Sequence, residues 1–198
     1  MVSNAEKPIV HCADAEEWRQ WLEANADTSD GVRLAIAKKG GDHPSVSYAE
    51  AIDEALCVGW IDGQRSALDE HHFLQVFTPR RARSIWSRVN RDKVTALIES
   101  GRMQPSGLAE IERAKADGRW DAAYAGSKTI EVPAELRAAL DAEPAAAAFF
   151  ETLNSQNRFA ILFRLHNVKK VETRDRNIEK FVAMLARGET IYPQKPAR

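Results

Sequence analysis

The sequence predicts an α+β fold: a small three-stranded, mostly antiparallel sheet packed with helices, followed by an all-helical C-terminal part. Alternating apolar residues indicate three short strands, at 31–38, 60–68 and 72–78. After Pro79 the apolar spacing changes to the period of a helix, and everything beyond about residue 88 should be helical. Three strands with helices on one side fit α+β better than a doubly wound sheet.

Two predicted helices flank the first strand. In "DAEEWRQWLEAN", Trp18, Trp21 and Leu22 recur at i, i+3 and i+4, which is typical of an amphipathic helix. In "SYAEAIDEALCVGW", Ser47 and Glu50 lie three apart, which is the capping-box signature of a helix start. The segments "WIDGQRSAL" and "HFLQVFT" then form a hairpin around "DEHH". The predicted order is therefore α-β-α-β-β, followed by helices.

Helices fill the rest of the chain. "VNRDKVTALIESG" offers Asn90 as an N-cap, and "PSGLAEIERAKADG" places Pro105 in a first helical turn. We divide the chain into an α+β domain at 1–125, a linker at 126–133, and a helical C-terminal region at 134–198 packed on the first domain.

Composition and charge narrow the class of protein. The chain has 198 residues and a net charge of −1, so no overall field attracts nucleic acid or membranes. No apolar run approaches the roughly 18 residues of a membrane span. "MVSNAEKPIV" lacks the pattern of a signal peptide, so we expect a cytoplasmic protein. Cys12 and Cys57 are too few for a disulfide scaffold, and Cys57 should be a buried thiol.

The stretch "GWIDGQR" places an aromatic ring beside polar groups. Strand alternation puts Trp60, Asp62 and Gln64 on one face of the strand and Arg65 on the other. A Trp beside a carboxylate and an amide can form the floor of a ligand site. The alternative is that Trp60 belongs to the core and Asp62 accepts backbone N–H groups in a turn.

The segment "TPRRARSIWSRVN" concentrates positive charge around another Trp. From 80 to 93, six Arg and Lys residues stand against one acid, Asp92, which gives a net charge of +5. Arginines, hydroxyls and free N–H groups at a helix start suit an anion site. The alternative is that these arginines pair with acidic helix faces. The acids available are Glu50, Asp53, Glu54, Glu110 and Glu112.

We expect the two stretches to form the walls of one polar cleft. Its ligand-binding residues would be Trp60, Asp62, Arg65, Arg80, Arg81, Ser84, Trp86 and Asn90. Because adjacent residues of an extended chain point opposite ways, at most one of Arg80 and Arg81 should face the cleft, close to Asp62. The expected ligand is a small anion or zwitterion. "DGRWDAAY" has a similar composition, for which the simplest explanation is a helix stop followed by a packed Trp.

Other chemical motifs are missing from the sequence. It contains no H-x-x-x-H, C-x-x-C or H-E-x-x-H, and the adjacent side chains of His71 and His72 diverge, so we predict no metal site. It has no G-x-S-x-G, Walker A or G-x-G-x-x-G motif, so we predict no cofactor.

Three alternatives to anion binding stay open. One is a nucleic-acid-binding accessory protein that uses the basic segment 80–93, with Trp86 for base stacking. Another is an enzyme with Asp62 as general base, although the sequence favours binding over catalysis. The last is a structural role for the arginines, with function in a protein contact. A short basic segment in a chain of near-zero net charge favours the small anion.

The chain resembles a known bacterial family in several segments. The blocks "EALCVGWIDGQR", "FTPRRARSIWSRVN" and "GRMQPSGLAEIERAKADGRWDAAY", together with "KKVETRDRNIEKFV", resemble the YdeI/OmpD-associated family, also called bacteriocin-protection proteins. The resemblance spans roughly 45–190. It implies an α+β fold, a bacterial origin and a link to stress or bacteriocin resistance, but no catalytic residues. The family usually has a Trp in the helix before "KKVETR", whereas "RFAILFRLHNVKK" has none.

Overall fold

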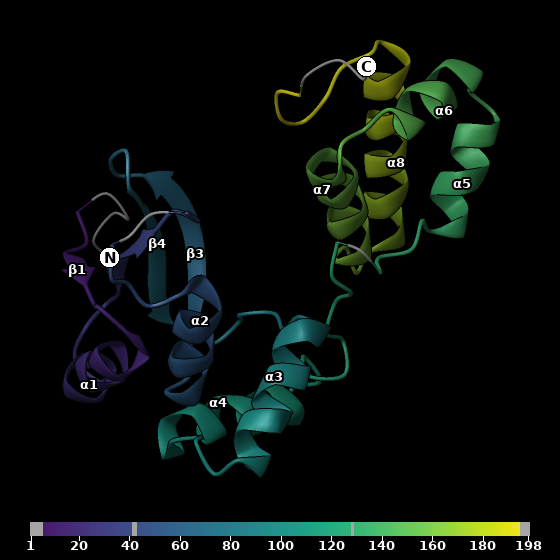
Figure 1. Cartoon of the computed structure of the whole chain (residues 1–198). Coiled ribbons are helices and arrows are strands. Elements are labelled where there is room, and N and C mark those ends of the chain that lie inside the picture. Colours follow the sequence, from purple (N-terminus) through teal and green to yellow (C-terminus); the bar gives the residue numbers. More distant parts are fainter. Residues whose placement is uncertain (1–5, 41–42, 128, 195–198) are drawn as a thin grey trace. The chain divides into compact units, whose positions relative to one another are not determined.

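The structure, a computed structural model, describes residues 6–40, 43–127 and 129–194 (Figure 1). It divides into two compact units, Met1–Ala123 and Tyr124–Arg198, called here the N-terminal and C-terminal units. No helix among the described residues is long and apolar enough to cross a membrane.

The N-terminal unit contains a mixed four-stranded sheet with helices. Its elements are β1 (Ile9–His11), α1 (Ala15–Asn25), β2 (Val32–Ala37), α2 (Tyr48–Cys57), β3 (Trp60–Ala67), β4 (His72–Pro79), α3 (Arg88–Glu99) and α4 (Pro105–Ala116). The strand order is β1-β2-β4-β3. β1 runs parallel to β2, and the other neighbouring pairs are antiparallel.

The α+β class is confirmed, but the prediction of a three-stranded, mostly antiparallel sheet is wrong. The additional strand, β1, has only the three residues "IVH", too few to show an alternating pattern. Its pairing depends on β2, which lies more than twenty residues further along the chain, with His11 opposite Ala35. The Arg33 N–H also donates to the Pro8 carbonyl oxygen at 2.9 Å, which continues the contact before β1 begins.

A β-bulge interrupts β3 and changes which face its side chains occupy. Asp62 lies opposite Phe77, but the next partner pair on this face is Arg65 with Gln75, so β3 has an extra residue between the two pairs. Cross-strand partners share a face, and Arg65 therefore lies on the same face as Asp62 and Trp60. The prediction of strict alternation, with Arg65 on the opposite face, is wrong for this reason.

Large aromatic side chains from α1 and the sheet form the core of the N-terminal unit. Trp18 of α1 is fully buried and packs against Phe77 of β4, with their ring centroids 5.4 Å apart. Its indole Nε1 donates to the Ala51 carbonyl oxygen of α2 at 3.1 Å. One side chain thus links α1, α2 and the sheet.

Both cysteines are free and buried, as predicted for Cys57. Burial raises the pKa of each thiol from 9.0 to about 11, because the ionised form would lose its hydration; nearby carboxylates act in the same direction. Cys12 and Cys57 are therefore neutral thiols at physiological pH and serve as packing groups.

The C-terminal unit is helical. It contains α5 (Ala134–Asp141), α6 (Pro144–Glu151), α7 (Ser155–His166) and α8 (Val171–Ala186). The core includes Leu136 and Leu140 of α5, Phe150 of α6, and Phe181 of α8. Residues 134–187, all of which the structure describes, contain no strand, which confirms the helical prediction for this part.

We predict that Gly107→Ala destabilises the protein, although Gly→Ala inside a helix normally stabilises it by up to about 1 kcal/mol. A Cβ at Gly107 of α4 would lie 2.2 Å from the Cys57 carbonyl oxygen at the end of α2. Relieving this clash should cost about 1–3 kcal/mol. Urea unfolding measures the change, with Ser106→Ala on the exposed side of α4 as the control. A stabilised Gly107→Ala protein would contradict the close contact between the two helices.

Candidate functional site

The structure places Trp60, expected to line the cleft, in the core instead. Only 1% of Trp60 is exposed. Its ring packs edge-on against Trp21 with a centroid distance of 6.0 Å, and its Nε1 donates to the Ala26 carbonyl oxygen at 3.3 Å. Trp60 thus corresponds to the core alternative raised by the sequence, and a ligand could not reach its face without displacing α1.

Asp62 and Arg65 make local contacts at the sheet. The Asp62 carboxylate accepts a hydrogen bond from the Tyr48 hydroxyl at 2.8 Å. The exposed Arg65 guanidinium lies over the Phe73 ring, 3.5 Å from its centroid. Between them, the Gln75 side-chain amide donates to the Gly63 carbonyl oxygen at 2.8 Å, which supplies a donor to the backbone at the bulge.

Arg80 and Arg81 differ in exposure, and only Arg80 is turned into the interior. Arg80 is buried, with 6% exposed, and its guanidinium stacks on the Trp86 ring at 3.6 Å from the centroid. Arg81 is exposed, and its backbone N–H donates to the Ser84 hydroxyl at 2.9 Å. The buried arginine therefore faces Trp86, while Asp62 lies opposite Phe77 on the strand before this loop.

Asn90 does not cap α3, which corrects the prediction from the sequence. The N-cap is Ser87, whose hydroxyl accepts the Asn90 backbone N–H at 3.1 Å. Ser87 and Asn90 are both suitable N-cap residues and lie three apart, and the sequence pattern favoured Asn90.

Two segments that looked independent in the sequence meet around Trp86. The Trp86 and Trp120 rings pack edge-on with their centroids 5.2 Å apart. Arg91 donates from Nη1 to the Trp120 carbonyl oxygen at 2.8 Å, and its guanidinium lies 5.0 Å from the Trp120 ring centroid. Arg119 donates from Nη1 to the Ser84 carbonyl oxygen at 2.7 Å. We call this set the Arg–Trp cluster: Arg80, Ser84, Trp86, Arg91, Arg119 and Trp120.

Sequence reasoning assigned three of these residues to the site and missed the role of the other three. Arg91 was counted only as part of the basic segment, while Arg119 and Trp120 belong to "DGRWDAAY", which looked like a helix stop with a packed Trp. Both "TPRRARSIWSRVN" and "DGRWDAAY" contain Arg and Trp, and this similarity was the only sign in the sequence that the two segments meet.

The ion pairs of the acidic residues considered as partners are with Lys93, at the end of the basic segment, and with cations outside it. Asp53 pairs with Lys93 at 2.6 Å, and Glu54 pairs with Arg102 at 2.5 Å. Glu110 and Glu112 pair within α4, with Arg113 and Lys115. The interactions that hold the Arg–Trp cluster are instead contacts of guanidinium groups with carbonyl oxygens and aromatic rings.

One carboxylate lies at the edge of the cluster. The Arg119 Nε donates to both Asp117 carboxylate oxygens, at 2.7 and 2.8 Å. These bonds hold the pKa of Asp117 below its ordinary value. Asp117 is exposed and Arg119 is 15% exposed at its side chain, so the cluster reaches solvent at this edge.

Two buried donors in the cluster have no hydrogen-bond acceptor among the described residues: the Trp86 indole Nε1 and the Arg119 Nη2. The indole N–H groups of Trp18 and Trp60, by contrast, both donate to carbonyl oxygens. A buried donor without an acceptor costs about 1–3 kcal/mol, and more when it is charged. The cluster therefore combines positive charge with hydrogen-bonding capacity that the described part of the chain does not use.

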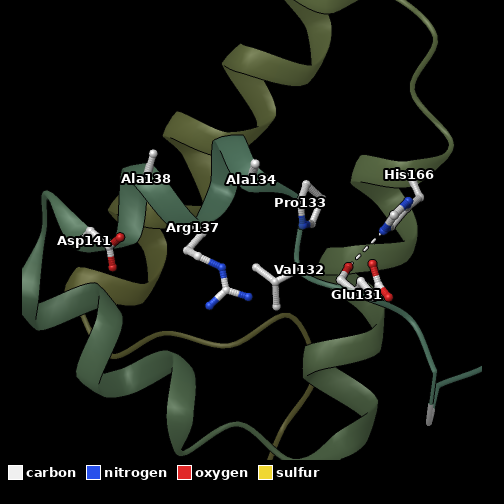
Figure 2. Close-up of a pocket in the computed structure, with 8 residues that line it drawn as sticks. All are labelled: Glu131, Val132, Pro133, Ala134, Arg137, Ala138, Asp141 and His166. Atoms are coloured by element: carbon white, nitrogen blue, oxygen red, sulfur yellow. Dashed lines mark hydrogen bonds between the residues drawn. The ribbon is translucent and has the colours of Figure 1, made fainter.

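The C-terminal unit has an open groove of about 480 Å³ that the sequence did not indicate (Figure 2). It is lined by Glu131, Val132, Pro133, Ala134, Arg137, Ala138, Asp141 and His166. The His166 Nε2 donates to the Glu131 carbonyl oxygen at 2.9 Å, and this bond joins α7 to the segment before α5. Arg137 points away from Asp141, although the two are one turn apart on α5 (Figure 2). The polar groups here are exposed and of both charge signs, which makes this groove a weaker candidate than the cluster.

The chain is a two-unit α+β protein with a cluster of arginine and tryptophan side chains in its first unit. Residues 10–110, just over half of the chain, match the family described as "Domain of unknown function (DUF8412)", and the chain belongs to this family. Residues 129–188 match the family described as "Bacteriocin-protection, YdeI or OmpD-Associated". This second match confirms the resemblance and contains the segment "KKVETRDRNIEKFV". No curated protein and no solved structure matches the chain.

We predict that Trp86→Phe costs less stability than Trp18→Phe in the absence of added ligand. Both changes shorten a buried indole to a phenyl ring, but only Trp18 loses a hydrogen bond, the one to Ala51. The difference in the free energy of unfolding should be about 1 kcal/mol or more. Urea unfolding of the two variants in a buffer free of oxyanions measures it. A larger loss for Trp86→Phe would show that the Trp86 N–H has an acceptor within the folded chain.

Proposed function

We propose that this is a binding protein for a small oxyanion, which it holds at the Arg–Trp cluster. The observation that carries the proposal is the pair of buried donors, Trp86 Nε1 and Arg119 Nη2, for which the described residues supply no acceptor. A phosphate, sulfate or carboxylate oxygen accepts hydrogen bonds from both groups, and its negative charge offsets that of the guanidinium groups.

The surroundings support recognition of an anion at this place. The side chains of Arg81, Arg83 and Arg88 are exposed around the same loop and make the local field positive, while the net charge of the chain is −1. Arg80 stacked on Trp86, and Arg91 bound to the Trp120 carbonyl oxygen, hold the aromatic rings in place. A site whose donors are already oriented loses little entropy when the ligand binds.

The set of ligand residues expected from the sequence is therefore revised in the proposal. Arg80, Ser84 and Trp86 stay, and Arg91, Arg119 and Trp120 join them. Trp60 and Trp86 are both buried, but Trp60 is left out because its indole N–H already donates to the Ala26 carbonyl oxygen. Asp62 and Arg65 are left out because their contacts lie elsewhere on the sheet. A role in bacteriocin resistance is suggested by the family description, and the link to stress and the cytoplasmic location are expectations from the sequence; all three belong to the same proposal.

We expect sodium phosphate and sodium sulfate to raise the melting temperature more than sodium chloride does at equal ionic strength. A ligand at 100 times its Kd stabilises the folded state by about 2.7 kcal/mol. The phosphate effect should shrink in Trp86→Phe, which removes one donor, and in Arg119→Lys, which keeps the charge but loses the guanidinium fork. Trp18→Phe should keep the full effect, because its N–H lies outside the cluster.

Two results would overturn the proposal. One is a phosphate effect no larger than that of chloride, and the other is an equal effect in wild type and Trp86→Phe. Fluorescence titration with a single-stranded oligonucleotide separates the small anion from a polynucleotide. Binding to the oligonucleotide that persists in Trp86→Phe, without any effect of inorganic phosphate, would assign the exposed arginines to nucleic acid instead.

A further inference from the structure

Four of the five histidines gather at one end of the sheet in the N-terminal unit. The ring centroids of His43 and His71 lie 4.3 Å apart, and those of His43 and His72 lie 5.3 Å apart. The ring centroids of His11 and His72 lie 6.1 Å apart, and those of His71 and His72 lie 6.5 Å apart. We call His11, His43, His71 and His72 the histidine cluster. They come from three separate segments, which is why the sequence showed only a neighbouring pair.

Backbone pairing fixes the positions of these segments. His11 ends β1, and His72 begins β4, where it lies opposite Ala37 at the end of β2. The Lys38 N–H donates to the His71 carbonyl oxygen at 2.7 Å, which ties the β3–β4 turn to β2. The Ala37 N–H donates to the Ser45 hydroxyl at 2.9 Å, which brings the loop with His43 to the same end of the sheet.

The distances between the rings fit ligands of one metal ion. A Zn–N bond of about 2.0–2.1 Å puts the centroid of a bound imidazole about 3.2 Å from the metal, so two tetrahedral ligands have centroids about 5 Å apart. The three distances among His43, His71 and His72 lie on both sides of this value.

The ring nitrogens do not yet converge. Among the residues that the structure describes, no three His, Cys, Asp or Glu side chains are arranged to hold a metal ion. His43 and His71 are exposed, however, so both rings can turn between rotamers without disturbing the core.

Asp69 prepares one of the histidines for this role. Its Oδ1 accepts the backbone N–H groups of His71 and His72, at 2.7 and 2.6 Å. The same oxygen lies 3.2 Å from the His72 Nδ1. A proton on Nδ1 donates to the carboxylate and leaves Nε2 as a free lone pair, which is the arrangement that carboxylates impose on histidines that bind metals.

We propose that the histidine cluster binds a divalent transition-metal ion that prefers imidazole, such as Zn²⁺ or Ni²⁺. His43, His71 and His72 would be the ligands, and Asp69 would orient His72. A bound ion links the β3–β4 turn to the loop before α2, and so it stabilises this end of the sheet. The site is separate from the Arg–Trp cluster and does not depend on anion binding.

Calorimetric titration of the full chain, first treated with a chelator, with ZnCl₂ and NiCl₂ tests the proposal. We expect saturable binding of one ion per chain and a higher melting temperature. The double variant His43→Ala, His71→Ala should lose about tenfold or more in affinity. Asp69→Asn should lose about 10–100-fold, because it weakens the orientation of His72. His166→Ala, which removes the fifth histidine, should bind like the wild type, and Mg²⁺ should not bind because it requires oxygen ligands.

His43 and His71 are exposed, so the double variant should fold like the wild type, and circular dichroism checks this directly. Absence of Zn²⁺ and Ni²⁺ binding to the wild type would overturn the proposal. Equal affinity in the wild type and the folded double variant would overturn it too, since the ion would then be bound at another place.

Discussion

The stacking of Arg80 on Trp86 is the contact on which the arrangement of the candidate site depends. Arg80 follows β4, and its backbone N–H still donates to the Gly59 carbonyl oxygen at 3.1 Å, so its position is set by the sheet. Trp86 comes two residues before α3 begins. The ring and the guanidinium, 3.6 Å apart, therefore fix the loop between the sheet and the helices. This loop presents the Ser84 carbonyl oxygen to Arg119 and lets Ser87 cap α3.

The chemistry of the site follows from the kind of partners its arginines have. Arg91 donates to the Trp120 carbonyl oxygen, which carries only partial negative charge, while Arg119 donates both to the Ser84 carbonyl oxygen and to the Asp117 carboxylate at the exposed edge of the cluster. The bonds to carbonyl oxygens satisfy geometry but neutralise less charge than a carboxylate would. The acids on α2 and α4 pair with Lys93, Arg102, Arg113 and Lys115 instead. A region that is positively charged and contains the buried donors Trp86 Nε1 and Arg119 Nη2 is suited to bind a small anion. These two features distinguish the cluster from a site where a Trp only packs in the core.

The sequence predicted those parts of the fold that depend on local patterns. The strands β3 and β4 and the capping box at Ser47 are encoded by neighbouring residues, and their bounds agree closely with the structure. β1 and the bulge in β3 depend on pairing with distant strands, so local alternation could not show them. The bulge is the reason that Arg65 was assigned to the wrong face.

The candidate site was predictable only in part, for a similar reason. Trp60 and Trp86 stand in equally polar surroundings in the sequence, yet Trp60 meets Trp21 in the core and Trp86 meets Arg80. Which Trp faces which partner is decided by packing between segments far apart in the chain. The meeting of Trp86 with Trp120, and of His43 with His71, likewise joins segments that no spacing rule connects.

The most direct test of anion binding is the NMR signal of the Trp86 indole N–H during titration with sodium phosphate at constant ionic strength. The assignment comes from the loss of one indole signal in Trp86→Phe. We expect the Trp86 signal to shift with saturation and its hydrogen exchange to slow, because the N–H gains an acceptor, while the signals of Trp18 and Trp60, which already have acceptors, stay in place. An unmoved Trp86 signal, or equal shifts of all three, would contradict the account.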